Sequence, residues 1–335
     1  MDTTLVSILV PIYNVEQYIE RCARSLFEQT YQNLEYVFVN DCTPDKSVEI
    51  LKNVLNDYPD RKETVKIINH EQNLGLAVTR NTTINHAIGE FVCLVDSDDW
   101  MEPNAIEVLM NKQSENNVDM VSGNRVVHYH TGDGLLQEKK YFNKEQMVLH
   151  MMQMSWDHLI TGRVFRRSLF VDNNLKWNEG LDLAEDRYMM TLLAYYSKGF
   201  DTVDNVVYHY ERRNVNSITN SKKKEKVFRN YNQELCNVLS LKDFFNNKES
   251  VYKNACIVQV MKLLEFNMQL ALAYSSKKEF QRVVGMIDSY SDDDLNLIDW
   301  EKTGLKGWYL HTYILMRFNW LKRKTIRFVK KRLTK

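Results

Sequence analysis

Short apolar runs alternate with helical patterns through the first third of the chain. Apolar runs of this length, rich in β-branched residues, are typical of strands buried on both faces. In the segments between them, apolar residues recur every three or four positions, which predicts amphipathic helices. This alternation favours a mostly parallel sheet covered by helices. The predicted strands cover residues 6–10, 34–39, 65–68 and 91–95, and the predicted helices cover 15–27, 47–55, 74–87 and 104–115.

Polar side chains follow three of these predicted strands directly. Right-handed crossovers bring the carboxyl ends of parallel strands to a common edge, where ligands bind in sheets of this class. Asn14, Asp41 and Asp96 each lie just past a strand on that edge. The pattern therefore predicts a ligand site there.

The strand predicted at 91–95 runs into three carboxylates, Asp96, Asp98 and Asp99. Like charges a few ångströms apart repel and raise one another's pKa, so such a cluster favours a compensating cation. Carboxylate oxygens suit Mg²⁺ or Mn²⁺, which commonly bridge carboxylates to substrate phosphates. The alternative is a solvated acidic turn, because Asp is a common turn residue.

The pattern changes from residue 118 onward. Further strands are predicted at 120–122, 126–130 and 203–210, and helices at 144–154 and 184–196. A lysine run at 222–224 precedes long helical segments that continue to the end. We therefore predict two domains: an α/β domain over residues 1–220 and a helical C-terminal extension over 221–335.

Composition narrows the class of protein. The chain has 335 residues, and its 44 Lys and Arg balance 44 Asp and Glu, so the molecule as a whole is no polyanion binder. No stretch approaches the roughly 18 apolar residues of a membrane-spanning helix, and no secretory signal pattern begins the chain. Five cysteines without paired spacing fit reduced thiols better than a disulfide framework. We expect a cytoplasmic protein.

Five motifs occur in a fixed order over about the first two thirds of the chain. They are VPIYN at 10–14, VNDCTPD at 39–45, NLGL at 73–76 with Arg80 and Asn81, DSDD at 96–99, and Glu185-Asp186 followed by Tyr210, Arg212 and Ser217. The ordered set resembles glycosyltransferase family 2, the inverting enzymes with the GT-A fold. The resemblance implies a Rossmann-like α/β domain that binds a nucleotide sugar.

The resemblance also assigns roles on the donor side. Asp41 would accept a hydrogen bond from the imide nitrogen of uracil or thymine, and mismatched bases would leave a polar group unpaired. Arg80 would lie close to the phosphates or the donor sugar, and Asp99 would contact the sugar or orient the loop. The other implied donor-binding residues are Pro11, Tyr13, Asn14, Asp96 and Ser97.

A D-x-D element is implied by Asp96 and Asp98, with Asp98 the more direct ligand of Mn²⁺ or Mg²⁺. The ion would neutralise charge developing on the leaving nucleoside diphosphate. His209 is a candidate for an additional metal contact, with a packing role as its alternative.

Inversion needs a base on the face of the sugar opposite the leaving group. The family's base matches Asp186, with Glu185 as its helper or an acceptor contact. Both begin a predicted helix, where the helix dipole favours an ionised carboxylate. The alternative is that the two acids only cap this helix, as Asp and Glu do routinely.

The chain departs from the family pattern in three places. The turn at 40–45 keeps Asp41 and Asp45 but lacks the usual first acid and glycine. The Gln-x-x-Arg-Trp element of processive members is absent, so we expect transfer of a single sugar. Trp156, Asp157 and His158 occupy the place of a Trp-Asn-Lys element and are expected on the acceptor side.

The last segment, 317–335, carries nine basic residues and no acid, interleaved with aromatic and aliphatic ones. A basic amphipathic helix suits an anionic membrane surface, here at the inner face of the cell membrane. A solvated helix packing on the domain fits equally well. Nucleic acid is a weaker option because no recognised binding module is present.

Together these features predict a metal-assisted, inverting hexosyltransferase that moves one sugar, most simply from a UDP-sugar. The resemblance further implies that the acceptor is a hydroxyl of a glycan or lipid-linked glycan in bacterial surface-polysaccharide assembly. One alternative is a nucleotidyltransferase, although no Gly-rich, Arg- or Lys-bearing phosphate loop follows the first strand. The other is a catalytically silent sugar-nucleotide binder or membrane-docked scaffold, since a fold does not fix a function.

Overall fold

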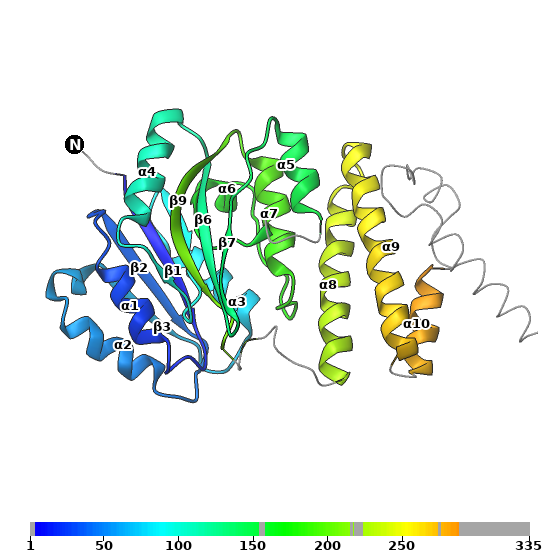
Figure 1. The fold of residues 1–335 in the computed structure, drawn as a ribbon, viewed down its shortest axis with the longest axis horizontal. Coiled ribbons are helices and arrows are strands. Elements are labelled where there is room, and N and C mark those ends of the chain that lie inside the picture. Colours follow the sequence, from blue (N-terminus) through cyan, green and yellow to red (C-terminus); the bar gives the residue numbers. More distant parts are fainter. Residues whose placement is uncertain (1–3, 154–157, 215–216, 218–223, 274–275, 288–335) are drawn as a thin grey trace, which may run out of the picture. The chain divides into compact units, whose positions relative to one another are not determined.

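The computed structural model describes residues 4–153, 158–214, 217, 224–273 and 276–287. The chain divides into two compact units, Met1–Asn247 and Lys248–Lys335 (Figure 1). Trp156, Asp157 and the basic segment 317–335 lie outside the described residues, so the predictions made for them remain predictions.

The first unit is built on a nine-stranded sheet with strand order β3-β2-β1-β4-β8-β6-β9-β5, in which β7 pairs with β6. β1 to β4 are parallel, with Val6 of β1 opposite Leu34 of β2 and Phe91 of β4. Beyond β4 the sheet is mixed: β8 is antiparallel to β4 and β6, whereas β9 is parallel to β6. The strands are β1 Val6–Ile12, β2 Leu34–Asn40, β3 Val65–Asn69, β4 Phe91–Leu94, β5 Trp100–Met101, β6 Met120–Tyr129, β7 Gly132–Leu136, β8 Arg163–Arg166 and β9 Phe200–Glu211.

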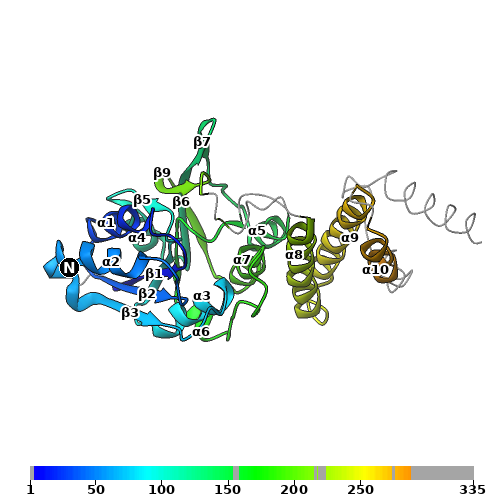
Figure 2. The same ribbon diagram turned by 90° about the horizontal axis from the view of Figure 1, so that it is seen from below.

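Helices cover both faces of the parallel half. Alternate residues of β1, Val6, Ile8, Val10 and Ile12, join a core with apolar side chains of α1, α2 and α4. Because side chains alternate along a strand, helix α3, which contacts β1 and β2, covers the opposite face (Figure 2). The helices of this unit are α1 Ile19–Phe27, α2 Ser47–Asn56, α3 Leu76–His86, α4 Ala105–Asn116, α5 Lys144–Met151, α6 Ser168–Val171, α7 Glu185–Tyr196 and α8 Lys224–Phe244, with a 3₁₀ turn η1 at Pro59–Thr64.

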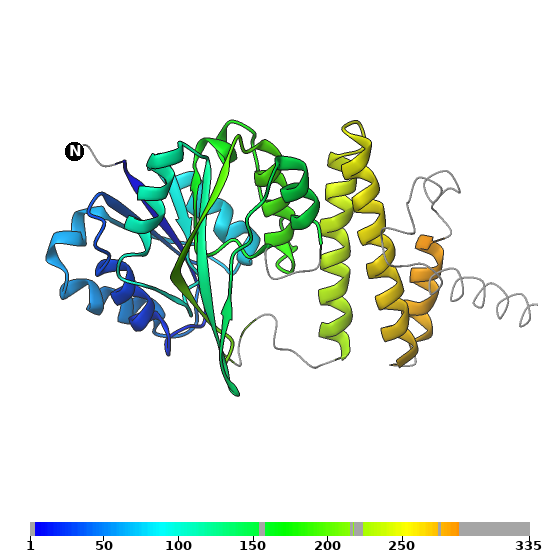
Figure 3. The same cartoon turned by 45° about the horizontal axis from the view of Figure 1, so that its top comes forward.

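Helix α8 belongs to this first unit. It packs on α7, and Figure 3 shows the two helices side by side. Leu235, Val238 and Leu241 of α8 are buried. The structure thus groups α8 with the sheet, whereas the sequence pattern placed it in the C-terminal extension.

The described part of the second unit consists of α9 (Ser250–Ala273) and α10 (Lys277–Ile287), which pack against each other. Across the described residues, no helix combines the length and apolar character needed to cross a bilayer.

Candidate active site

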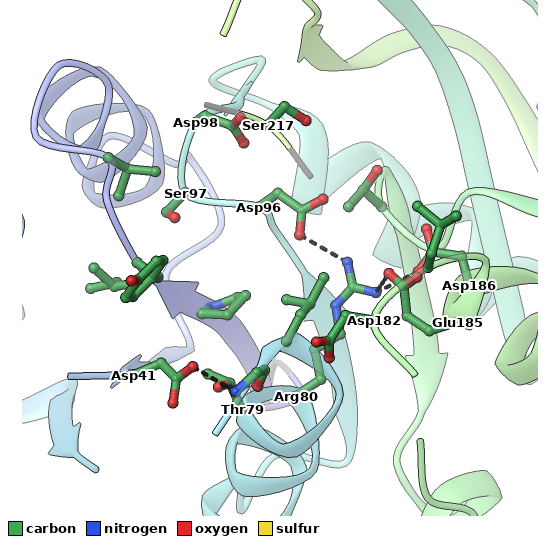
Figure 4. A pocket seen from close by; sticks show the side chains of 18 of the residues that line it. Asp41, Thr79, Arg80, Asp96, Ser97, Asp98, Asp182, Glu185, Asp186 and Ser217 are labelled. Atoms are coloured by element: carbon green, nitrogen blue, oxygen red, sulfur yellow. Dashed lines mark hydrogen bonds and ion pairs between the residues drawn. The ribbon is translucent and has the colours of Figure 1, made fainter. Parts of the chain in front are cut away.

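A cavity of about 490 Å³ opens at the carboxyl ends of β1, β2 and β4. The loops after these strands, the start of α3 and the start of α7 supply its walls (Figure 4). The ligand site predicted at this edge is therefore formed by several distant segments. Its polar lining includes Tyr13, Asn14, Asp41, Asn73, Thr79, Arg80, Asp96, Ser97, Asp98, His158, Thr161, Asp182, Glu185, Asp186, Asn214 and Ser217.

Arg80 of α3 lies at the centre of a cluster of charged side chains in the cavity wall. Its guanidinium is buried and pairs with three carboxylates. Nη1 lies 2.8 Å from Oε1 of Glu185 and 2.5 Å from Oδ1 of Asp186, and Nη2 lies 2.9 Å from Oδ1 of Asp96. One cation therefore ties the loop after β4 to the start of α7. Arg80 also lines the cavity, so its expected position close to the phosphates or the donor sugar remains a prediction.

The two acids of α7 have different surroundings. The second oxygen of Asp186, Oδ2, accepts a hydrogen bond from the backbone N–H of Ile160 at 3.3 Å. Burial, and next the charge of Asp186, raise the pKa of Glu185 to about 8, although Arg80 opposes the shift. Burial and the neighbouring charge of Asp186 thus favour the protonated form of Glu185, while Asp186 has both a cation and a backbone donor.

The acidic loop 96–99 splits into two parts. Asp96 and Asp98 line the cavity, and Oδ2 of Asp98 accepts a hydrogen bond from Asn214 at 2.8 Å. Burial, and next the charge of Asp96, raise the pKa of Asp98 to about 6. Such a shift marks a carboxylate that lacks full charge compensation.

Asp99 faces away from the cavity lining and is buried. Its Oδ2 accepts a hydrogen bond from the Tyr208 hydroxyl at 2.6 Å, and its Oδ1 accepts one from the backbone N–H of Glu211 at 2.7 Å. The Tyr208 hydroxyl in turn accepts from the N–H of Asp96. Of the two roles expected for Asp99, the contacts fit orientation of the loop.

On the opposite side of the cavity, Asp41 holds the loop before α3. Its carboxylate accepts hydrogen bonds from the N–H groups of Leu74 and Gly75 at 2.8 and 2.9 Å, and Nδ1 of His70 lies 2.8 Å away. Gly75 has φ +91°, and a Cβ there would lie 2.8 Å from Oδ2 of Asp182. Glycine is required here both for backbone conformation and for space. Asp41 lines the cavity, so its role in reading a base remains a prediction.

The altered turn at 40–45 is stabilised by its own polar groups. Cys42 adopts the left-handed conformation, φ +54°, where the family pattern has glycine. Asp45 accepts hydrogen bonds from Thr43, Ser47 and the N–H of Glu16. Pro11 of β1, and Tyr13 and Asn14 of the loop that follows it, line the cavity, and their role in donor binding remains a prediction.

His209 does not lie with Asp96 and Asp98. Its ring stacks on Trp100, with centroids 4.8 Å apart, and its nitrogens lie 2.7 Å from Glu102 and 3.1 Å from His128. The packing alternative for His209 fits this placement better than the metal contact. Within the described ranges, no group of three or more His, Cys, Asp or Glu side chains is arranged as a metal site.

The residues present nevertheless suit a divalent ion held partly by substrate. Two cavity-lining carboxylates, Asp96 and Asp98, are available, and the raised pKa of Asp98 shows that a cation there would relieve repulsion. Mg²⁺ and similar ions are usually bound through one or two carboxylates, with waters and substrate phosphates completing the shell.

Several lining residues were missed by sequence reasoning, among them Asp182, Asn214 and Thr161. Asp182 accepts a hydrogen bond from the N–H of Ala77 at the start of α3, at 3.0 Å. Asn214 binds Asp98, and Thr161 lies beside His158 in the cavity wall. None of the three lies in a recognisable motif, so only the tertiary structure brings them to the site. His158 lines the cavity as expected for the acceptor side, which is a placement and not a demonstrated role.

Comparison with known proteins agrees with this architecture. The family model "Glycosyl transferase family 2" matches residues 7–172. EpsH of Bacillus subtilis, a putative glycosyltransferase, is 30% identical over 63% of this chain and 61% of its own length. EpsJ of the same organism, an uncharacterized glycosyltransferase, is 32% identical over 64% of this chain and 63% of its own length. The matches thus span about three fifths of these curated relatives.

Solved structures share the fold. S. aureus TarS in complex with UDP-GlcNAc superposes with a TM-score of 0.67 and 19% identity, covering 91% of this chain and 87% of the other. The mannosyltransferase PcManGT of Pyrobaculum calidifontis, in complex with GDP-Man and Mn²⁺, gives 0.55 with 17% identity, covering 94% and 84%. The GT-A fold expected from the motifs is confirmed. From the matched family model, the motif order and the shared fold together, residues 7–172 of the chain belong to glycosyltransferase family 2.

Proposed function

We propose that this protein is an inverting glycosyltransferase that transfers one sugar from a UDP-sugar to a hydroxyl of a glycan or lipid-linked glycan. The observation that carries the proposal is the ion-pair cluster of Arg80 with Asp96, Glu185 and Asp186. This cluster supports the proposal because Asp186, Asp96 and Asp98 all line one cavity.

The donor nucleotide would lie between the loops after β1 and β2. Pro11, Tyr13 and Asn14 line one side and Asp41 the other, with Ser97 near the phosphates. The fold shared with TarS, solved with UDP and with UDP-GlcNAc, favours a uridine nucleotide. A carboxylate such as Asp41 can distinguish bases, because a base without the matching donor leaves it unpaired.

Asp98 and Asp96 would hold Mn²⁺ or Mg²⁺ together with the diphosphate. When bound, the ion supplies charge neutralisation on the leaving nucleoside diphosphate. Within the protein, Asn214 orients Asp98 and Arg80 orients Asp96. The complex of PcManGT with Mn²⁺ supports this choice of cofactor.

Asp186 would act as the base. The acceptor hydroxyl gives its proton to this carboxylate while its oxygen bonds to the anomeric carbon, and the bond from that carbon to the diphosphate oxygen breaks on the opposite face. The configuration is therefore inverted. Arg80 and the N–H of Ile160 fix the carboxylate, which is the preorganisation that general-base catalysis requires. Glu185 shares the same guanidinium and would assist through an acceptor contact.

The proposed biological setting is inferred from the names of similar proteins. EpsH and EpsJ are named as glycosyltransferases, and GgaB of Bacillus subtilis, 25% identical over 91% of this chain, is named as a minor teichoic acid biosynthesis protein. These names support a role in surface-polysaccharide assembly. The enzyme would act in the cytoplasm, at the inner face of the membrane if the acceptor is lipid-linked.

Nucleotide release tests the proposal. The protein is incubated with a panel of UDP-, GDP- and dTDP-sugars, with Mn²⁺ or with EDTA, and the products are resolved by chromatography. We expect metal-dependent release of UDP from one or a few UDP-sugars. Release of pyrophosphate would indicate a nucleotidyltransferase, and nucleotide binding without any turnover would indicate a silent binder; either result would overturn the proposal.

A further inference from the structure

Helix α8 makes polar contacts to the loop that leads into α7. Asn237 of α8 is buried, and its Nδ2 donates a hydrogen bond to the carbonyl oxygen of Leu183 at 2.9 Å. Its Oδ1 accepts one from Nδ2 of Asn178, also at 2.9 Å. One turn earlier, Gln233 donates to the carbonyl of Gly180 at 2.9 Å. Both ends of the loop 178–183 are therefore attached to α8.

A buried ion pair joins α8 to α7 itself. Nη2 of Arg187 donates to Oε1 of Glu234, and both side chains are almost fully excluded from solvent. Arg187 directly follows Asp186 in α7. Removing one partner of a buried pair leaves the other charge uncompensated, so this contact strongly favours one position of α8 on α7.

Between these anchors the backbone adopts an unfavourable conformation. Ala184, at the N-terminal boundary of α7, has φ 55° and ψ 23°, the left-handed region. A residue with a Cβ pays about 1–2 kcal/mol for this conformation, and it persists only where surrounding contacts impose it. The carbonyl that precedes this strained residue is that of Leu183, the group held by Asn237.

We propose that Asn237 is a positioning residue for the reaction: through the Leu183 carbonyl it holds Ala184 in the left-handed conformation and so fixes Glu185 and Asp186 at the cavity. Helix α8 is then part of the catalytic unit, although it lies outside the residues matched by the family model, 7–172. The inference rests on the proposed function of Asp186. The attachment of the loop 178–183 to α8 explains why Asp182 and Leu183 line the cavity beside Glu185 and Asp186.

Three variants test this role. Asn237→Asp keeps the shape and the acceptor but replaces the donor to Leu183 with a carboxylate oxygen. We expect kcat for UDP release to fall roughly tenfold to a hundredfold, as for other misplaced catalytic groups, with donor KM within about twofold. Ala184→Gly removes the cost of the left-handed conformation. In the double variant Asn237→Asp/Ala184→Gly, most of the lost kcat should return.

The matched control is Asn230→Asp, the same chemical change two turns earlier on α8. Among the described contacts, the loop 178–183 receives no hydrogen bond from Asn230. This variant should retain wild-type kcat. An equal loss in both Asn→Asp variants would assign the effect to added charge on α8 and overturn the positioning role.

Hydrogen–deuterium exchange gives a readout that does not depend on turnover. In Asn237→Asp the amides of residues 183–188 should exchange faster, and Ala184→Gly should restore their protection, while those of β2 remain unchanged. Unchanged exchange at 183–188, or failure of Ala184→Gly to restore kcat, would overturn the proposal. If the wild type releases no UDP from any donor, the proposed function fails, and the exchange result still decides whether Asn237 fixes this segment.

Discussion

The guanidinium of Arg80 lies 2.5 Å from the carboxylate of Asp186, although 106 residues separate them in the chain. Arg80 comes from the first, parallel half of the sheet region, and Asp186 comes from α7, which lies in the chain between β8 and β9 of the mixed half. The same guanidinium reaches Asp96 at the end of β4. The candidate base and the acidic loop therefore share one buried cation, which couples the position of each to the other.

The first prediction concerns that cation. Arg80→Met keeps much of the side-chain volume but leaves Asp96, Glu185 and Asp186 without compensation. We expect a loss of about 3–5 kcal/mol in the free energy of unfolding, the usual cost of removing one partner from a buried ion pair. Urea denaturation measures it.

Arg24→Met provides the control, because Arg24 pairs with Glu20 and Asp57 at the surface. Exposed pairs contribute at most about 1 kcal/mol. A similar decrease in the free energy of unfolding of both variants would contradict the claim that the buried cluster around Arg80 stabilises the fold more than a surface ion pair does.

The second prediction concerns metal binding and pH. The pKa of Asp98 is raised to about 6 by burial and by Asp96, and a divalent ion binds the ionised carboxylate. In the presence of UDP, the affinity for Mn²⁺ should therefore fall about tenfold per pH unit below the pKa and level off above it. Calorimetric titration between pH 5 and pH 8 measures this, and Asp98→Asn should abolish the dependence. An affinity that is constant over this range would count against Asp98 as a ligand.

The third prediction gives the sign of a stability change in the metal-free protein. Because the folded-state pKa of Asp98 lies above the ordinary value of 3.8, the folded state holds a proton that the unfolded chain loses. The free energy of unfolding should therefore decrease as pH rises from about 4 to about 6. Thermal unfolding of wild type and Asp98→Asn over this range tests the sign; the variant should show the smaller decrease. An identical slope in both proteins would refute the assignment.

The fourth prediction concerns a second buried cluster, beside the part of the cavity wall that contains Thr161. Arg125 and Arg163 share the carboxylate of Glu138 at 2.5 and 2.7 Å, and all three side chains are fully buried. Arg125 also donates to the carbonyl of Thr161, next to the residue whose N–H binds Asp186. Glu138→Gln should cost about 3–5 kcal/mol of stability, because two buried cations would lose their counter-charge.

Glu90→Gln is the matched control for this variant. Glu90 is exposed and pairs with Arg166 at the surface. The Glu90→Gln substitution should lower the free energy of unfolding by less than about 1 kcal/mol. If Glu138→Gln unfolds at the same urea concentration as wild type, the cluster does not support the fold.

The fifth prediction concerns Cys42, an exposed residue in the left-handed conformation. Glycine at this position avoids the Cβ contact that disfavours this conformation, and the greater freedom of the unfolded chain offsets part of that gain. We expect Cys42→Gly to stabilise the protein by about 0.5–1 kcal/mol. Urea denaturation under reducing conditions measures this change in the free energy of unfolding. A destabilised variant would contradict the conclusion that the left-handed conformation of Cys42 is unfavourable.

Much of the fold could be predicted because its first half follows local rules. The apolar runs at 6–10, 34–39, 65–68 and 91–95 all form strands, since buried parallel strands read as continuous apolar segments. The edge position of Asp41 and Asp96 followed from the crossover rule alone. The second half was harder, because β8 enters the sheet between β4 and β6 by antiparallel pairing that no local pattern specifies.

The site was predictable where motifs carry it and not where tertiary contacts do. Asp96, Asp98, Glu185 and Asp186 line the same cavity, and their roles remain predictions. His209 lies beside Trp100 and Glu102, which fits its packing alternative, because alternation along β9 does not show which side chain turns toward these residues. Likewise, Gln233 and Asn237 of α8, which bind the loop 178–183, lie in no motif, so the grouping of α8 with the first unit could not be read from the sequence.

The most direct test compares UDP release by wild type and Asp186→Asn with the same donor, acceptor and Mn²⁺ concentration. Asparagine keeps the shape and the hydrogen-bond acceptor but cannot take the acceptor proton at neutral pH. We predict a loss in kcat of about 10²–10⁴-fold with UDP affinity retained. Wild-type turnover in the Asp186→Asn protein, with UDP bound equally well, would contradict the account.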